Sequence, residues 1–153
     1  LYPAKAALVT REWVGQFSIA TYRPMQRLLG NDDLAFISAQ PAFGKSCVAR
    51  FRKQRARLFV EYLRGIAGDF DRMHRTAKLL LMHGAEDRSN LVNQLALQRI
   101  IFSAALLRVH WKVFLYRQGW TLPEANIASM IDAVESMRSQ VHEMLVQPAV
   151  AAQ

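Results

Sequence analysis

Cysteine is almost absent from this chain, which has only Cys47 among its 153 residues. A single cysteine excludes an internal disulfide framework and fits a reducing compartment, so we expect a cytoplasmic protein. Low-complexity tracts and internal repeats are also missing, apart from a short alanine-rich tail after Pro148. With 52% apolar and 21% charged residues, the chain has the composition of a globular protein and not of a disordered one.

Long hydrophobic runs are missing as well. The longest uncharged run in the most apolar stretch covers eight residues, from Ile100 to Leu107. A membrane-spanning helix needs about 20 residues, so we predict no transmembrane segment, and no signal peptide is recognisable. Because the chain begins with Leu1 instead of methionine, we expect a fragment or a processed product, and an upstream membrane anchor stays an open alternative.

Signals for β-structure are lacking too. No stretch alternates β-branched and polar residues, and the Asn-Gly and Asp-Gly pairs typical of hairpins do not occur. Apolar residues recur at steps of three and four. The sequence therefore predicts an all-α protein, an up-down bundle of about four main helices and one short helix. We expect a single domain over residues 1–147, followed by a disordered or frayed tail over 148–153.

Several segments carry this helical pattern. We expect a first helix over residues 4–22 and a short one near 32–37, followed by a long helix from an N-cap at Ser46 to about His83. A capping box at 121–124 opens the last helix. That helix has an apolar seam with the a/d spacing of a coiled coil, formed by Ile127, Met130, Val134, Met137, Val141 and Met144.

The long helix that ends near His83 combines one apolar face with two internal glycines. Gly65 and Gly68 each cost about 1 kcal/mol relative to alanine, so we expect another segment to cross closely there. The face itself follows steps of three and four through Phe59, Tyr62, Ile66, Phe70, Met73, Ala77 and Leu80. It should pack in the core of the bundle.

The helix expected over residues 89–118 is apolar on nearly every side. A helix of this kind is usually buried. At about 100° per residue, its polar residues fall into two opposite stripes, one of Arg99, Ser103, His110 and Arg117, and one of Gln94, Arg108 and Lys112. We therefore predict a central helix sandwiched between neighbours, with the first stripe as a polar seam between helices. Whether that seam lines a cavity or belongs to a satisfied core is left open.

Positive charge is concentrated in one segment. Of the net charge of +8, residues 45–78 carry ten basic and three acidic side chains, whereas residues 119–153 have one basic and four acidic. The densest run places five cations in eight positions: Arg50, Arg52, Lys53, Arg55 and Arg57. They point in nearly every direction around the helix, so we expect its first two turns to project from the bundle and meet an anionic partner. A solvated helix start is the alternative.

No residue pattern predicts a catalytic centre. The Gly-Lys-Ser triplet at 44–46 resembles the end of a phosphate-binding loop, but that motif needs a glycine where this chain has Ala39. Asp71 and His74 share one helix face, yet a metal site in a bundle needs a second such pair. We therefore expect no metal, no cofactor and no enzyme activity. The alternative is an enzyme with its pocket around His74 and His110.

Helix faces are the remaining candidates for function. We expect a non-enzymatic interaction or scaffold domain that packs on a partner protein or on itself. The seam of the last helix and the tryptophans Trp13, Trp111 and Trp120 would supply apolar contact area, which predicts an exposed apolar patch or an oligomer interface. The alternative is backbone-driven binding of nucleic acid, or of an anionic membrane surface, through residues 50–57.

Overall fold

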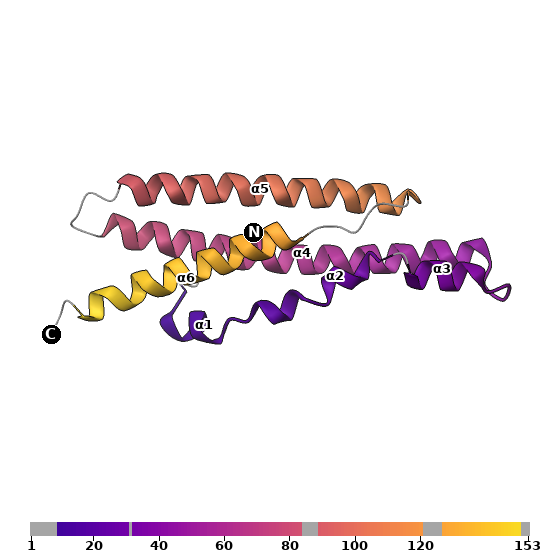
Figure 1. Cartoon of the computed structure of the whole chain (residues 1–153), viewed down its shortest axis with the longest axis horizontal. Helices are drawn as coiled ribbons and strands as arrows, with labels where there is room; N and C mark the ends of the chain where they lie inside the picture. Colours follow the sequence, from indigo (N-terminus) through magenta and orange to yellow (C-terminus); the bar gives the residue numbers. More distant parts are fainter. Residues whose placement is uncertain (1–8, 31, 84–88, 121–126, 151–153) are drawn as a thin grey trace, which may run out of the picture.

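The computed structural model describes residues 9–30, 32–83, 89–120 and 127–150, with side chains described up to residue 146. The all-α prediction is confirmed, because the described residues contain helices and no strand (Figure 1). In chain order the elements are α1 (Arg11–Gln16), the 3₁₀ helix η1 (Ile19–Tyr22), α2 (Met25–Leu28), α3 (Asp32–Ala39), α4 (Lys45–Met82), α5 (Ser89–Arg117) and α6 (Ala128–Val150).

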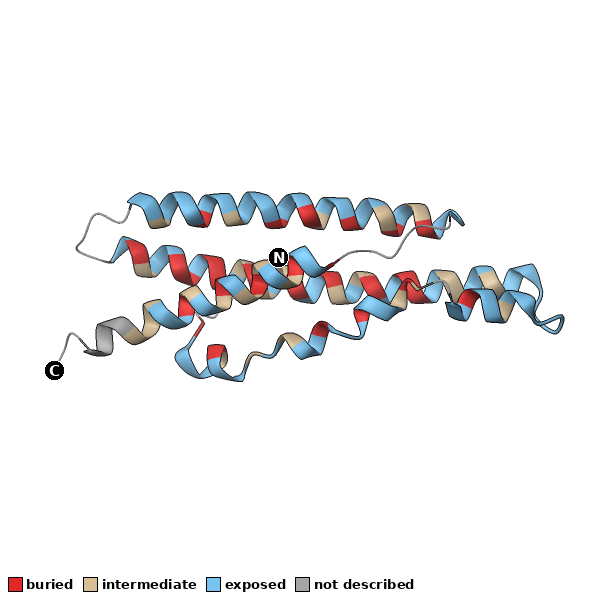
Figure 2. Cartoon of the chain, in the orientation of Figure 1, coloured by how far each residue is buried: buried red, intermediate tan, exposed pale blue. Residues whose placement is uncertain are grey.

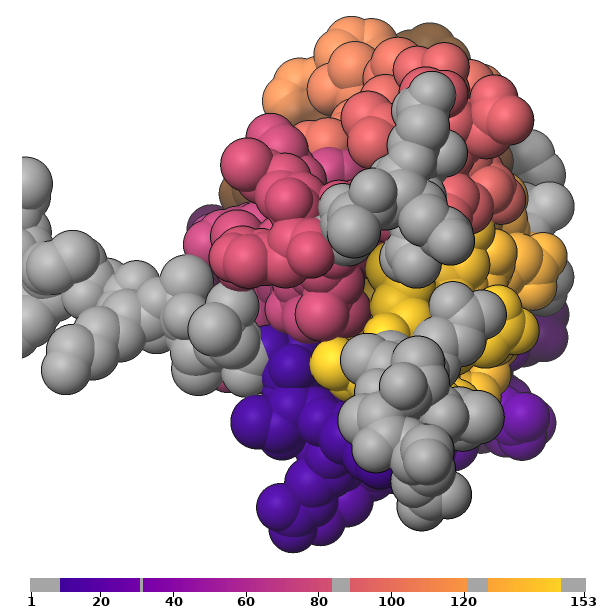
Figure 3. Space-filling view, turned by 90° about the vertical axis from the view of Figure 1, so that its left-hand side faces the viewer, coloured from indigo at the N-terminus to yellow at the C-terminus, as the bar shows by residue number. Residues whose placement is uncertain are grey.

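The helices lie in three layers, best seen from the end of the bundle (Figure 3). α4 and α6 form the middle layer, and α5 packs on one side of it. The short elements α1, η1 and α2 cover the opposite side, and α3 lies against the first half of α4. The long helices run alternately up and down, and α4 occupies the centre that we expected α5 to hold.

A regular apolar stripe places α4 in the core. Phe59, Leu63, Ile66 and Phe70 are all buried, at steps of four and three. Phe70 stacks on Phe102 of α5, with ring centroids 3.9 Å apart and an interplanar angle of 8°. Burying an aromatic side chain of this size contributes about 1.5–3 kcal/mol, so this pair is a major contact between α4 and α5.

The seam predicted for the last helix is confirmed. Residues 127, 130, 134, 137 and 141 of this seam are at most 2% exposed, and Met144 is half-buried. We had expected this seam to contact a partner, but it faces the core of the bundle and is not available to one. α6 is helical to Val150, so the first three residues of the tail expected over 148–153 belong to this helix. Residues 151–153 and the capping box at 121–124 lie outside the described residues.

The single helix expected over 4–22 is wrong for the residues that the structure describes. Thr10 caps α1, its hydroxyl accepting a hydrogen bond from the Trp13 amide at 3.2 Å. Two residues after α1 ends, the Ser18 hydroxyl accepts from the Ala20 amide at 3.3 Å and begins η1. Side chains of this type offer the backbone an alternative to a continuous helix. Thr10 and Ser18 thus divide the segment into short helical pieces.

The close approach expected at the glycines of α4 occurs at only one of them. A Cβ atom on Gly65 would lie 3.3 Å from the ring of Tyr22 in η1, whereas a Cβ on Gly68 would meet nothing within 4 Å. The Tyr22 hydroxyl also donates a hydrogen bond to Asp69. Burial, reinforced by Asp69, raises the pKa of Tyr22 well above its usual range. Tyr22 is therefore one of the residues that fix the N-terminal segment on α4, together with the Val9 amide, which donates to the Thr76 hydroxyl at 3.2 Å.

Candidate interaction surface

α5 buries apolar residues along one side and exposes others along the opposite side. Its buried and half-buried residues lie along the side that faces α4 and α6, and its outer side is exposed (Figure 2). The sandwiched position that we expected for this helix is therefore wrong, because nothing described covers its outer side. That side carries six small or apolar residues at steps of 3-4-3-4-3, called here the outer stripe: Leu97, Ile100, Ala104, Leu107, Trp111 and Phe114.

The outer stripe has the spacing of a helix–helix interface. Steps of three and four keep side chains on one line along a helix, as in the a/d seam of a coiled coil. From Leu97 to Phe114 the stripe runs about 26 Å, at about 1.5 Å per residue. The small side chain of Ala104 leaves a notch at its centre. Contiguous exposed apolar surface of this kind is uncommon on monomers and marks interaction sites.

The charges that border the outer stripe have one sign. α5 contains four basic residues and no acidic one between Ser89 and Arg117. Arg108 is exposed next to Leu107, and Arg99 and Arg117 are exposed on the border nearer α4. The apolar stripe is therefore framed by positive charge.

The polar seam predicted from Arg99, Ser103, His110 and Arg117 is an exposed border and not a buried seam. All four residues are exposed. The Nδ1 atom of His110 lies 2.9 Å from the carbonyl oxygen of Leu106, one turn earlier in the same helix. His110 is about 16 Å along α5 from Arg99 at 1.5 Å per residue. The structure thus separates His110 from His74, which the sequence had suggested as pocket partners.

The start of α4 has no buried residue before Arg55, as expected of a projecting segment, but the basic run is partly engaged within the protein. Arg55 is buried and donates hydrogen bonds to the Asp33 carboxylate at 2.9 Å and to the Arg27 carbonyl at 3.0 Å. Its guanidinium also lies over the Phe51 ring, 5.3 Å from the ring centroid. Arg55 thus joins α4 to α3 through Asp33, beside the buried Leu34 of α3.

Three of the five cations in this run are exposed. Arg52 is half-buried, with its guanidinium 5.8 Å from the centroid of the Tyr116 ring, whereas Arg50, Lys53 and Arg57 face solvent. Lys53 and Arg57 line a hollow of about 320 Å³ between α4 and α5. Arg117 of α5 lines the same hollow, so the run joins the basic border of α5 and does not form a separate surface.

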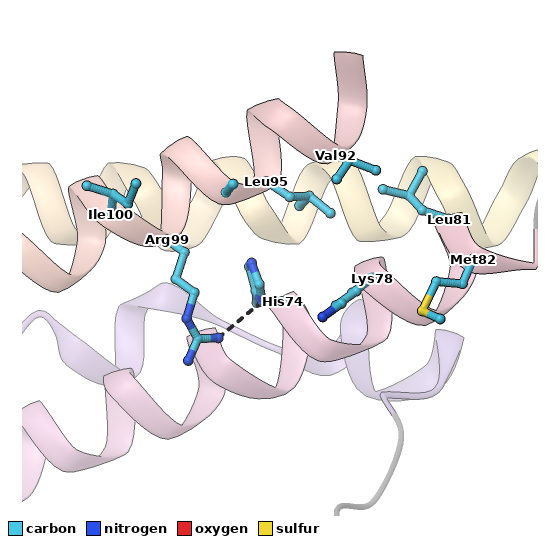
Figure 4. Close-up of a pocket in the computed structure, with 9 residues that line it drawn as sticks. His74, Lys78, Leu81, Met82, Val92, Leu95, Arg99 and Ile100 are labelled. Atoms are coloured by element: carbon cyan, nitrogen blue, oxygen red, sulfur yellow. Dashed lines mark hydrogen bonds between the residues drawn. The ribbon is translucent and has the colours of Figure 1, made fainter. Parts of the chain in front are cut away.

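A larger cavity lies between the end of α4 and the start of α5. Its volume is about 490 Å³, within the range of about 300–1,000 Å³ found for small-molecule sites. Three nitrogen-bearing side chains stand along one side and apolar side chains along the other (Figure 4). The lining residues are His74, Lys78, Leu81, Met82, Val92, Leu95, Ala96, Arg99 and Ile100.

His74 is the buried polar group of this cavity. Arg99 donates a hydrogen bond to its Nδ1 atom at 3.3 Å. Burial lowers the pKa of His74, and the neighbouring charge of Arg99 lowers it further. The ring is therefore neutral, and because Nδ1 accepts a hydrogen bond, the proton sits on Nε2. That N–H lies buried beside the backbone of Leu95, whose hydrogen bond to the ring acts on the pKa in the opposite direction but more weakly than burial and Arg99.

The carboxylate nearest to His74 is already paired. Asp71 accepts hydrogen bonds from Arg75 and, at 3.2 Å, from Arg99. The hydrogen bond from Arg75 is the main cause that lowers the pKa of Asp71. Across the described ranges, no three His, Cys, Asp or Glu side chains gather closely enough to hold a metal ion.

The sequence suggested His74 as a residue of a pocket, but it did not predict that Arg99 and Lys78 line the same cavity. Arg99 and Lys78 come from two helices, and only the antiparallel register of α4 and α5 brings them together. The outer stripe could have been predicted from the sequence, since apolar residues recur at steps of three and four between Leu97 and Phe114. It was hidden because α5 has a second, equally apolar face.

Comparisons with protein-family models, with curated proteins and with solved structures found no match for this chain. In the part of the chain that the structure describes, no helix is both long and apolar enough to cross a membrane.

Proposed function

We propose that this protein is a helical interaction domain whose docking surface is the outer stripe of α5. The observation that carries the proposal is the stripe itself, a line of exposed apolar residues at heptad spacing that includes Leu107 and Trp111. Tryptophan is among the residues that contribute most to protein interfaces. A groove or face of this kind accepts an amphipathic helix, anchored by residues at i, i+3, i+4 and i+7.

The positive charge around the outer stripe indicates which kind of helix would bind there. The outer stripe is bordered by Arg99, Arg108 and Arg117, and α5 has no acidic residue. Complementary charges at the margins of an interface favour the right partner and disfavour like-charged ones. The partner that fits is an amphipathic helix with apolar anchors and acidic flanks. A length of about 18 residues matches a stripe of about 26 Å.

A second copy of this chain fits less well. Two α5 helices would bring arginine against arginine, which costs affinity. α6 carries acidic residues, but up to residue 146, where its side chains are described, its exposed residues, among them Ser129, Asp132, Ser136 and Ser139, supply no large apolar anchor. α3 carries the exposed Phe36 and two aspartates, yet its eight residues extend only about 12 Å.

Nucleic-acid or anionic-membrane binding through residues 50–57 is the alternative proposal, and less supports it. Arg55 is paired with Asp33, and Arg52 lies over Tyr116. Arg50, Lys53 and Arg57 are left for phosphate, together with Arg117 beside them. A cytoplasmic location is also a proposal, and it rests on the single Cys47.

Designed peptides test the docking surface. The first is a 21-residue helix, about three heptads, with leucine at a and d and glutamate at e and g. The second replaces the glutamates with lysines. Fluorescence anisotropy, at peptide concentrations where sedimentation shows a monomer, should find the acidic peptide bound at least about tenfold more tightly than the basic one, or about 1.4 kcal/mol.

Variants locate the binding. Leu107→Gln together with Trp111→Gln should abolish binding of the acidic peptide, because both anchors of the stripe are lost. Leu58→Gln is the matched control, since Leu58 is also exposed but lies on α4, outside the stripe. Binding that survives the double variant, or that Leu58→Gln removes equally, contradicts the proposal.

Sedimentation of the protein alone separates the second copy from a foreign helix. We expect a monomer in the micromolar range. A dimer that dissociates in the Leu107→Gln and Trp111→Gln variant would support the docking surface but contradict the proposal that its partner is a foreign acidic helix. A dimer that this variant leaves intact would move the interface away from α5.

A further inference from the structure

The cavity beside His74 has a wall that suits an aliphatic chain. Six of its nine lining residues are aliphatic, alanine or methionine, and none is aspartate or glutamate. Val92 and Ile100, at its two ends on α5, are about 12 Å apart along the helix. Burying a methylene group contributes about 0.8 kcal/mol, so a chain of eight to twelve carbons gains substantially from this wall.

The polar side of the same cavity offers only hydrogen-bond donors. Arg99 and Lys78 have cationic heads, and the neutral His74 lies between them with its Nδ1 atom hydrogen-bonded to Arg99. No described carboxylate lies within 4 Å of Lys78, and Asp71 holds Arg99 and Arg75 from outside the lining. The lining therefore has two cations and no carboxylate, and of these two cations Asp71 pairs only with Arg99.

We propose that this cavity binds a small amphiphile with an aliphatic chain and an anionic headgroup, such as a fatty carboxylate. The chain lies along Leu95, Val92 and Met82, and the headgroup lies between Arg99 and Lys78. In Figure 4 the nitrogen-bearing side chains stand in a row opposite Ile100, Leu95 and Val92, with Met82 beside Lys78, which is close to the division that such a molecule requires. The inference does not depend on the proposed docking of a partner helix.

Calorimetric titration with two matched amphiphiles tests the charge requirement. Decanoate and decyltrimethylammonium have the same chain length and opposite charge, and both are used below their critical micelle concentrations at about pH 7.5. We expect decanoate to bind at least about tenfold more tightly. Butyrate, which has the headgroup and almost no chain, should not bind. Equal affinity for the two long-chain probes, or no binding of decanoate, overturns the proposal.

Two variants and one control test whether decanoate binds in this cavity. Ala96→Trp fills it and should reduce decanoate affinity at least tenfold, whereas Gln94→Trp adds the same side chain to an exposed position of α5 outside the lining. Lys78→Glu, on the exposed surface of α4, should reverse the preference toward decyltrimethylammonium even if Ala96→Trp fails to fold. Decanoate affinity that Lys78→Glu leaves unchanged would put the ligand elsewhere and overturn the assignment.

The outcomes separate this inference from the proposed function. The variants at Leu107 and Trp111 lie outside the cavity lining. They should leave decanoate affinity within about twofold. A protein that binds decanoate but no acidic helix keeps the cavity and loses the docking surface, and the reverse result keeps the docking surface alone.

Discussion

Leu107 and Trp111 lie one turn apart on the outer side of α5, with exposed fractions of 73% and 62%. Between them Val109 is buried at 3% exposure against the core. α5 therefore has two apolar faces, of which the protein itself covers one. An exposed face with heptad spacing has a physical explanation when a second helix covers it.

The two faces of α5 differ in what they contribute to stability. Leu95 is buried and Leu97 is exposed, two residues apart in the same helix. We expect Leu95→Ala to lower the free energy of unfolding by about 2–5 kcal/mol, as for other buried leucines. Leu97→Ala should change it by less than about 0.5 kcal/mol. Urea denaturation of the two variants measures the difference, and equal losses would mean that the outer face is covered within the monomer.

The two glycines of α4 provide a second matched pair. Gly68→Ala meets no neighbour within 4 Å, so it should raise the free energy of unfolding by about 0.5–1 kcal/mol through helix propensity. Gly65→Ala gains the same propensity but forces Tyr22 to move from 3.3 Å. We expect it to be less stable than Gly68→Ala. Thermal denaturation ranks the two, and the opposite order would mean that Tyr22 does not pack on α4.

Stability should fall in mildly acidic solution because of His74. Burial and Arg99 lower its pKa below the ordinary value of about 6.5. Between the lowered folded pKa and 6.5, the unfolded chain binds a proton that the folded chain refuses, so stability rises with pH in this window. The slope from one group is at most about 1.4 kcal/mol per pH unit.

Urea denaturation between about pH 5 and pH 7 measures this dependence. His74→Gln removes the titrating group and should flatten the profile, while the other three histidines are common to both proteins. Asp71, whose pKa is lowered mainly by Arg75, loses its contribution only below its ordinary range. A profile that His74→Gln leaves unchanged contradicts the neutral, buried state of His74.

The basic run of α4 has few free cations, which limits the number of phosphate contacts that a nucleic acid can make with this protein. With Arg55 and Arg52 engaged internally, we expect three or four phosphate contacts from Arg50, Lys53, Arg57 and Arg117. Raising the salt from about 50 to about 200 mM should then weaken duplex DNA binding by about 40- to 150-fold. Anisotropy with labelled DNA measures the loss. A much steeper dependence would require cations that this surface does not offer.

The spacing of apolar residues predicted which residues share a face of each helix. It predicted less well which helix packs against that face. The seam of α6 was read from its 3-4 spacing, and Met130 and Met137 are fully buried as that spacing requires. The same reasoning found two apolar faces on α5. It placed a helix against each face, because a pattern shows which residues share a side and not what covers that side.

Long-range pairing explains the other differences. Arg55 reads as one of five exposed cations until Asp33, 22 residues earlier, is seen to lie against it. Arg99 and His74 are 25 residues apart and meet only because α4 and α5 run antiparallel. No local spacing predicts such contacts, so charge patterns identified the segments involved but not the side chains that neutralise one another.

The measurement that tests the docking surface most directly is an amide ¹H–¹⁵N spectrum of the protein titrated with the acidic helical peptide. The account predicts shift changes concentrated at residues 97–114 of α5, with the outward positions of α6, such as Asp132 and Ser139, unaffected. Changes concentrated at residues 50–57 or along α6, or no change at peptide excess, would contradict it.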